Sequence, residues 1–230
     1  MNLPNAITVA RIAAAPFIAV LPFVPTATAR LAAFVLFIVA AVTDYWDGHL
    51  ARTRNLVTDL GRLLDPLADK LLLVATFVPM VVMMGGPLLR PLRSFASMRP
   101  EFAFITPVGF VGLPWWIVAV VVGREVFMTV FRQVAARRGL VIGAIGPAKW
   151  KTGFQSTWVG AAYFWFFAQT LAQRSGWEGT AAFRAWAYFN GIVGALAMVG
   201  AVGLTLYSLA LYLRRYGGIL RAPTPSSARR

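Results

Sequence analysis

The chain has 230 residues, of which 59% are hydrophobic and only 13% are charged, and its formal net charge is +14. A soluble domain typically carries about 25% charged residues, so this composition excludes an ordinary soluble protein and predicts an integral membrane protein. In a membrane protein, a basic excess indicates anionic lipid headgroups and the positive-inside rule rather than nucleic-acid binding. The chain has no cysteine, which excludes disulfides and thiolate metal sites.

Six apolar stretches approach or exceed the roughly 20 residues that cross a bilayer, and they predict an all-α bundle of six transmembrane helices. Pro16 interrupts the first stretch, which favours a first span over a cleaved secretory signal. Residues 85–113 are rich in proline and arginine and are expected to form a loop. The membrane domain is expected at residues 1–216, followed by a basic, disordered tail at 217–230. The spans are predicted at residues 8–23, 29–52, 60–84, 114–137, 151–171 and 185–213.

Lysines and arginines are unequally divided between the two ends of these spans. Most of them lie near the N-terminus, after the second and fourth spans, and near the C-terminus. By the positive-inside rule, both termini are therefore expected on the cytoplasmic side. The end of the second span and the start of the third open to that same side.

Small residues recur along the sixth span. They allow helices to approach closely, so they predict packing against a neighbouring helix or a second subunit. Packing inside one bundle is the equally open alternative. The residues are Gly191, Gly194, Gly200 and Gly203.

Four aspartates lie in apolar surroundings at helical spacing. Asp44 and Asp47 are three residues apart, and Asp65 and Asp69 are four apart, so each pair shares a helix face. Carboxylates are costly in an apolar helix and repel one another, so a bound cation is expected. The two helices are predicted to form an antiparallel hairpin whose carboxylates converge. Oxygen ligands favour Mg²⁺ or Mn²⁺, with Ca²⁺ possible, over zinc; an ion pathway or a buried ion-pair network is the alternative.

Small and basic residues follow the second aspartate. Gly48 and Ala51 would let a flat ring or a phosphate approach the backbone. Arg52 carries a planar fork of donors suited to phosphate. Ordinary helix packing and membrane anchoring are the alternative interpretation of these residues.

A second basic cluster spans the fourth and fifth predicted helices. Arg124 and Arg132 are eight residues apart and share a helix face, and Lys149 and Lys151 begin the next span. Arg124 beside Glu125 is costly near a membrane and indicates a polar cavity. We expect these four cations to bind a phosphate on a second substrate.

The string Asp44-x2-Asp47-Gly48-x2-Ala51-Arg52-x8-Gly61-x3-Asp65-x3-Asp69 resembles the signature of the CDP-alcohol phosphotransferase family. The resemblance implies a six-helix membrane enzyme, usually a homodimer, in which an alcohol displaces CMP from a CDP-linked lipid with the help of two Mg²⁺ or Mn²⁺ ions. It implies that all four aspartates are metal ligands and that Asp69 is also the base on the acceptor hydroxyl. It assigns CDP-lipid binding to Asn5, Thr8, Gly48, Ala51, Arg52, Thr58 and Gly61.

Residues 2–8 and 43–47, together with the second basic cluster, are similar to the bacterial phosphatidylglycerophosphate synthase branch of that family. The branch implies CDP-diacylglycerol and sn-glycerol 3-phosphate as substrates, and an active site facing the cytoplasm at the bacterial inner membrane, among membrane lipids. Inositol phosphate or another alcohol as acceptor, and an ion or metal transporter, are the alternatives. The connection at 85–113 is longer than expected for the branch.

Overall fold

A computed structural model of the chain describes residues 3–53, 58–85, 102–140, 142–143 and 146–217. Inside the helices, the description leaves out the side chains of residues 3–4, 45, 47–53, 59–60, 62–63 and 147–149. The predicted tail beyond Gly217 and most of the predicted loop at 85–113 lie outside the described residues and stay predictions.

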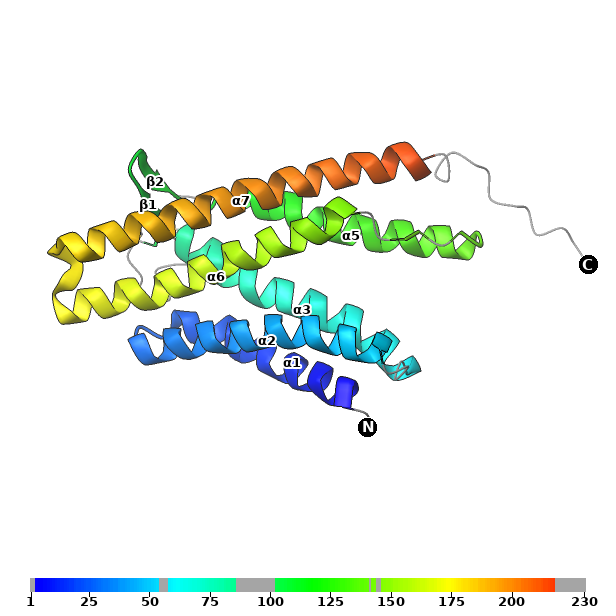
Figure 1. Ribbon diagram of the computed structural model, residues 1–230, viewed down its shortest axis with the longest axis horizontal. Helices are drawn as coiled ribbons and strands as arrows, with labels where there is room; N and C mark the ends of the chain where they lie inside the picture. Colours follow the sequence, from blue (N-terminus) through cyan, green and yellow to red (C-terminus); the bar gives the residue numbers. More distant parts are fainter. Residues whose placement is uncertain (1–2, 54–57, 86–101, 141, 144–145, 218–230) are drawn as a thin grey trace, which may run out of the picture.

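Long helices dominate the described part of the chain (Figure 1), which confirms the predicted all-α class. A short antiparallel hairpin, which the sequence did not predict, interrupts them inside the 85–113 connection. The helices are α1 (Leu3–Val20), α2 (Ala27–Thr53), α3 (Asp59–Met84), α5 (Trp115–Arg137), α6 (Gly146–Ser175) and α7 (Ala181–Tyr216), with short 3₁₀ turns η1 (Leu21–Phe23) and η3 (Trp177–Gly179). The strands are β1 (Phe104–Thr106) and β2 (Gly109–Val111).

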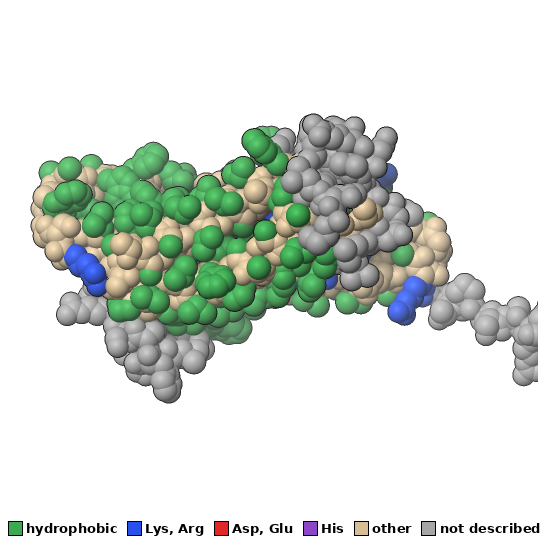
Figure 2. Space-filling view, turned by 90° about the horizontal axis from the view of Figure 1, so that it is seen from below, with side chains coloured by type: hydrophobic (Ala, Val, Ile, Leu, Met, Phe, Trp, Pro, Cys, Tyr) green, Lys and Arg blue, Asp and Glu red, His purple; other side chains and the backbone are tan. Residues whose placement is uncertain are grey.

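Four helical segments of the described chain are long and apolar enough to cross a membrane: Asn5–Phe23, Ala27–Asp44, Leu64–Met84 and Ala181–Tyr216. Helices α5 and α6 have 23 and 30 residues, but each carries more charged or polar side chains. The last helix, α7, has 36 residues, and at 1.5 Å per residue it is about 54 Å long. Apolar side chains cover most of the described face in Figure 2, where lysines and arginines lie mainly towards the two ends.

Threonine caps begin two of these helices. The hydroxyl of Thr58 accepts a hydrogen bond from the Gly61 N–H at 3.0 Å and so starts α3. Thr180 starts α7 in the same way, accepting from the Phe183 N–H at 3.2 Å. Gly176, with φ of 71°, supplies the left-handed residue that ends α6.

Helix α6 lies at the centre of the bundle and packs against α7 and α2. Its Trp158, Tyr163 and Trp165 side chains are completely buried. The Tyr163 hydroxyl lies 3.1 Å from the carbonyl oxygens of both Ile18 in α1 and Ala75 in α3. One aromatic side chain therefore holds three helices together in the core.

Helix α1 packs against both α2 and α3, and among the described residues it provides the main contact between them. Helices α2 and α3 run in opposite directions in Figure 1, as the sequence predicted for this pair, and α1 packs against both. Helix α2 packs on α6 as well as on α1, and the acidic ends of α2 and α3 meet beside the first turns of α1 through contacts with Thr8 and Arg11.

The hairpin is seated on glycines of α7. Phe104 and the backbone of Ile105 occupy the space where a Cβ on Gly194 or Gly191 would lie. Gly200 similarly makes room for Phe154 of α6. Gly191, Gly194 and Gly200 thus pack inside one chain, one of the two alternatives that the sequence left open, whereas a Cβ added at Gly203 would meet nothing within 4 Å.

Candidate active site

Three of the four predicted metal ligands gather around α1. The buried guanidinium of Arg11 forms an ion pair with the Asp44 carboxylate, and its Nη1 lies 3.6 Å from Oδ1 of Asp69. The Thr8 hydroxyl donates a hydrogen bond of 3.0 Å to Oδ1 of Asp65. Asp69 also interacts electrostatically with Asp44 and Asp65. Side chains of α1 therefore connect Asp44 of α2 with Asp65 and Asp69 of α3.

These carboxylates lie at one boundary of the apolar segments. The candidate span in α2 ends at Asp44, and the one in α3 begins at Leu64, one residue before Asp65. The Asp69 side chain is 63% exposed, and that of Asp65 is exposed as well. A substrate can therefore approach the acids from outside the bundle.

The second aspartate and the residues after it occupy the last turns of α2. The side chains of Asp47, Gly48, Ala51 and Arg52 lie outside the described residues. Among the side chains that are described, no group of three histidines, cysteines or acids is placed to hold a metal ion. The donors that are present, carboxylate and hydroxyl oxygens, are those a hard divalent cation prefers.

Three of the predicted CDP-lipid residues touch one another. The Asn5 side-chain amide donates to the Thr58 hydroxyl at 2.9 Å. A Cβ added at Gly61 would meet the Asn5 amide oxygen at 2.9 Å, so only glycine fits this contact without a shift. The first turn of α1 and the start of α3 are thus joined beside Thr8 and Asp65.

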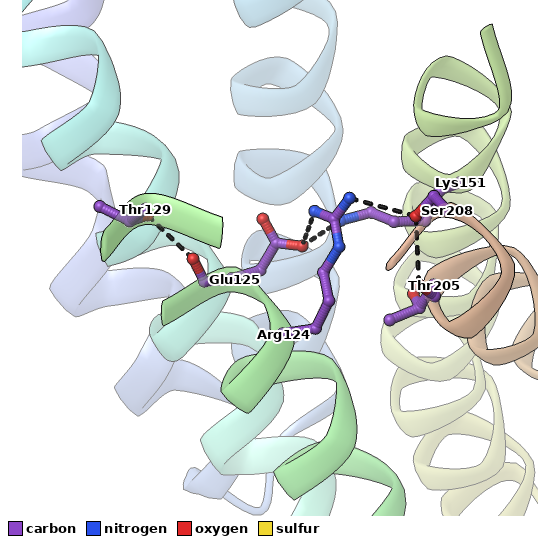
Figure 3. Close-up of polar contacts among 6 residues, drawn as sticks. All are labelled: Arg124, Glu125, Thr129, Lys151, Thr205 and Ser208. Atoms are coloured by element: carbon purple, nitrogen blue, oxygen red, sulfur yellow. Dashed lines mark hydrogen bonds and ion pairs between the residues drawn. The ribbon is translucent and has the colours of Figure 1, made fainter. Parts of the chain in front are cut away.

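The second basic cluster forms around a carboxylate (Figure 3). Arg124 Nη1 donates to Oε1 of Glu125 at 2.8 Å, and Lys151 forms an ion pair with the same oxygen. Arg124 Nη2 donates to the Ser208 hydroxyl of α7 at 3.1 Å. Both cations are buried, with 7% of Arg124 and 6% of Lys151 exposed. The structure thus brings these two predicted residues together.

Two polar atoms in this cluster have no hydrogen-bond partner. They are Nε of Arg124 and the hydroxyl of Thr205, one turn before Ser208 on α7. A buried donor without a partner is costly, so this is a place where a polar ligand would be stabilised. Arg132 instead is exposed, with its guanidinium 5.9 Å from the Tyr212 ring centre, and the Lys149 side chain lies outside the described residues.

Sequence reasoning missed several partners of the predicted residues. In the sequence Arg11 is one of many basic residues, and nothing there marks it as the counter-ion of Asp44 and Asp69. Glu125 was noted as costly but not as the bridge between two cations. Ser208 carries no signal in the sequence, because its role depends on how α7 packs against α5.

A groove of about 650 Å³ opens between α2, α6 and α7. It follows α2 from Phe34 to Trp46, a length of about 18 Å at 1.5 Å per residue. Trp46 and Asp44 lie on the same turn of α2, so one end of the groove is level with the acidic cluster along the helix axis, although the two side chains leave the helix in different directions. Its lining is mostly apolar, with Phe37, Ile38, Gly160, Phe164 and Val193 among the residues.

Figure 1 places the end of α2, the start of α3 and the end of α5 towards the same end of the bundle. Acids and buried cations therefore occur in one half of a membrane protein, an arrangement suited to an enzyme that handles phosphates. The model of the CDP-alcohol phosphatidyltransferase family matches residues 1–207, and the chain belongs to this family of enzymes.

Sequence similarity to curated relatives supports this family assignment. The CDP-diacylglycerol–glycerol-3-phosphate 3-phosphatidyltransferase of Bacillus subtilis (strain 168) is 37% identical over 166 residues, covering 67% of this chain and 72% of the relative. The chloroplastic/mitochondrial enzyme 1 of the same name from Arabidopsis thaliana is 30% identical over 227 residues, which cover 96% of this chain and 64% of the relative. A cardiolipin synthase (CMP-forming) of Oryza sativa subsp. japonica is 31% identical over 224 residues, which cover 96% of this chain and 59% of the relative.

Proposed function

We propose that this chain is a CDP-diacylglycerol–glycerol-3-phosphate 3-phosphatidyltransferase. It would transfer the phosphatidyl group of CDP-diacylglycerol to sn-glycerol 3-phosphate and release CMP. The observation that carries the proposal is the buried Arg124–Lys151 pair in the same half of the molecule as the acidic cluster, in a chain whose relatives bear this name.

Asp44, Asp47, Asp65 and Asp69 are proposed to hold Mg²⁺ or Mn²⁺, as two ions. Bound ions would supply charge neutralisation for the pyrophosphate and for the departing CMP. Arg11 keeps Asp44 and Asp69 next to each other, and Thr8 orients Asp65 through its hydrogen bond. The chain's own residues thus prearrange the acids before any ligand arrives.

Asp69 is proposed to take the proton of the acceptor hydroxyl. As the acceptor oxygen bonds to the lipid-linked phosphorus, the bond from that phosphorus to the CMP oxygen breaks, and the proton passes to the Asp69 carboxylate. The exposure of this side chain supports the role, because a base must reach the hydroxyl directly.

The nucleotide half of the donor is proposed to lie against Asn5, Thr8, Thr58 and Gly61. The mutual contact of Asn5, Thr58 and Gly61 supports one binding surface. Gly48, Ala51 and Arg52 would complete it from α2. An acyl chain of the lipid would follow the apolar groove along α2, because one end of the groove, at Trp46, lies on the same turn of α2 as Asp44.

The acceptor phosphate is proposed to bind Arg124 and Lys151, with Arg132 and Lys149 nearby. The unpartnered Nε of Arg124 supports this role, since a phosphate oxygen would satisfy it. A second candidate is the same transfer to a lipid acceptor, favoured by the similarity to the rice cardiolipin synthase. The buried position of both cations favours the smaller acceptor.

We further propose that α5 and α6 complete a six-span homodimeric enzyme of the bacterial inner membrane. Both termini and the active site would face the cytoplasm. The basic residues at the ends of α5 and α7, among them Arg137, Arg214 and Arg215, support this orientation.

The test is CMP release by the purified enzyme from CDP-diacylglycerol with a panel of acceptors. Glycerol 3-phosphate should give rapid release that stops when divalent cations are chelated and returns when Mg²⁺ or Mn²⁺ is added. Inositol phosphate, serine and phosphatidylglycerol should give little. Release with phosphatidylglycerol but not glycerol 3-phosphate would establish the second candidate instead.

A further inference from the structure

We propose that the β1–β2 hairpin is a membrane anchor, whose turn inserts into the lipid headgroup region at the end of the protein opposite Asp44. Its partner is the interfacial layer of the membrane. No catalytic role is involved, and the inference holds for any activity of the chain.

Large apolar side chains at the turn are almost fully exposed. Val108 is 95% exposed and Phe110 is 78% exposed, the highest values among the large hydrophobic residues of the described chain. Contact of such groups with water is unfavourable, by about 25 cal/mol per Å² of apolar surface. Exposed apolar groups concentrated at one projecting turn are typical of a surface that meets a membrane or another protein.

The hairpin is held firmly, so the exposure is a property of the fold. Phe104 and Ile105 sit on the glycines of α7, and the Leu113 N–H donates to the Met84 carbonyl at 3.1 Å. The Thr106 hydroxyl donates to the Gly109 carbonyl at 2.6 Å and closes the turn. Figure 1 shows the hairpin standing out to the side of α7.

Contacts with α2 place the hairpin near a membrane boundary. The guanidinium of Arg30, in the first turn of α2, lies 4.6 Å from the ring centre of Phe102, two residues before β1. The apolar segment Ala27–Asp44 has 18 residues, a length of about 27 Å, which matches the roughly 30 Å hydrocarbon layer. Arg30 and the hairpin therefore lie close to the boundary opposite Asp44.

Two opposing requirements select the headgroup region. A two-stranded sheet has open edges whose unpaired N–H and C=O groups need water, which excludes the hydrocarbon interior. Exposure of the apolar side chains of the turn to bulk water is unfavourable as well. Trp115 and Trp116, both half-exposed, begin α5 just after the hairpin, and tryptophan is enriched at membrane interfaces. The interfacial layer meets all of these requirements.

The natural absence of cysteine allows a direct test. Val108→Cys, labelled with an environment-sensitive fluorophore, would be reconstituted into phosphatidylglycerol/phosphatidylethanolamine vesicles. The matched control is Glu178→Cys in the exposed η3 turn. We expect emission from position 108 to be blue-shifted, quenched by lipids spin-labelled near the headgroup, and several-fold less sensitive to aqueous iodide than emission from position 178.

Two outcomes would overturn the anchor. Iodide quenching at position 108 equal to that at 178 would place the turn in water. Efficient disulfide cross-linking of unlabelled Val108→Cys between two copies under mild oxidation would show that a second subunit covers the turn.

A second variant ties the shielding to the apolar turn. Phe110→Asn added to labelled Val108→Cys should increase iodide quenching, whereas Phe189→Asn, at an exposed apolar position of α7, should not. Equal effects of the two changes would contradict the proposal. Because the readout is fluorescence, failure of the anchor leaves CMP release unaffected, and the two proposals are tested separately.

Discussion

The guanidinium of Arg11 is ion-paired with the carboxylate of Asp44, 33 residues later on the neighbouring helix. Arg11 is only 3% exposed, so its charge is neutralised chiefly by the acids of the proposed metal site. Removing it would leave those acids to repel one another. The relationship therefore links the stability of the bundle to the charge of the site.

Arg11→Met should lower the Tm in the absence of divalent cations by roughly 3–12 °C, because a charged hydrogen bond is lost. Mg²⁺ or Mn²⁺ should recover part of the loss by neutralising the acids in its place. Arg30→Met is the matched control, since Arg30 is equally buried but bonds to the Pro22 carbonyl and the Thr170 hydroxyl. Equal recovery of both variants in thermal unfolding would contradict a metal site beside Arg11.

Asp69→Asn should lower kcat for CMP release by roughly 100- to 10,000-fold, the usual contribution of a general base. Binding of CDP-diacylglycerol should be partly retained, because other residues are proposed to hold the nucleotide. Glu178→Gln, the same chemical change in the distant η3 turn, is the control and should be active. Near-normal turnover of Asp69→Asn would show that the base is misassigned.

Lys151→Ala should raise the KM for glycerol 3-phosphate by roughly 10- to 100-fold and change that for CDP-diacylglycerol much less, since charged hydrogen bonds contribute about 1.5–3 kcal/mol. Steady-state kinetics with each substrate varied in turn would measure both constants. Arg137→Ala, at the exposed end of α5, should affect neither. Equal rises in both constants would argue against two separate subsites.

Glu125→Gln should destabilise the protein, because Arg124 and Lys151 would then share a buried site without their counter-charge. Adding Lys151→Met should restore part of the stability by removing one of the two cations. Thermal unfolding of the two single variants and the double variant forms a double-mutant cycle. A coupling of about 1–3 kcal/mol is expected, and strictly additive effects would mean that the ion pairs contribute nothing.

Gly191→Ala should destabilise the fold by about 1–3 kcal/mol, because the new methyl group would collide with the backbone of Ile105. Gly203→Ala, on the same helix in open space, should be neutral or stabilising by up to about 1 kcal/mol. Detergent-solubilised unfolding curves would compare the two. Equal changes in the free energy of unfolding for the two variants would contradict the packing of the hairpin against Gly191 of α7.

The apolar stretches predicted the bounds of two helices closely. The expected spans at 60–84 and 114–137 agree with Asp59–Met84 and Trp115–Arg137 to within one residue. The predicted end of the fifth span at Leu171 is too early, since α6 continues to Ser175. Hydropathy measures how much of a helix prefers lipid, whereas its end is set by the glycine at 176.

The site was predictable only where spacing along one helix sufficed. Each aspartate pair follows from the helical repeat, but the position of Arg11 between Asp44 and Asp69 depends on how three helices pack. The bridge from Glu125 to Lys151 joins residues 26 apart on different helices. Such contacts leave no periodic pattern in a single sequence, and neither does a hairpin of two three-residue strands.

The surplus length of α7 affects how the protein meets membranes of different thickness. Its length of roughly 54 Å exceeds the thickness of the hydrocarbon layer by about 24 Å. A thicker or thinner bilayer would therefore change which residues of α7 lie at the membrane boundary, without breaking the helix. Of the four candidate spans in the described chain, α7 alone has this surplus, so it is the helix whose boundary residues would shift with acyl-chain length.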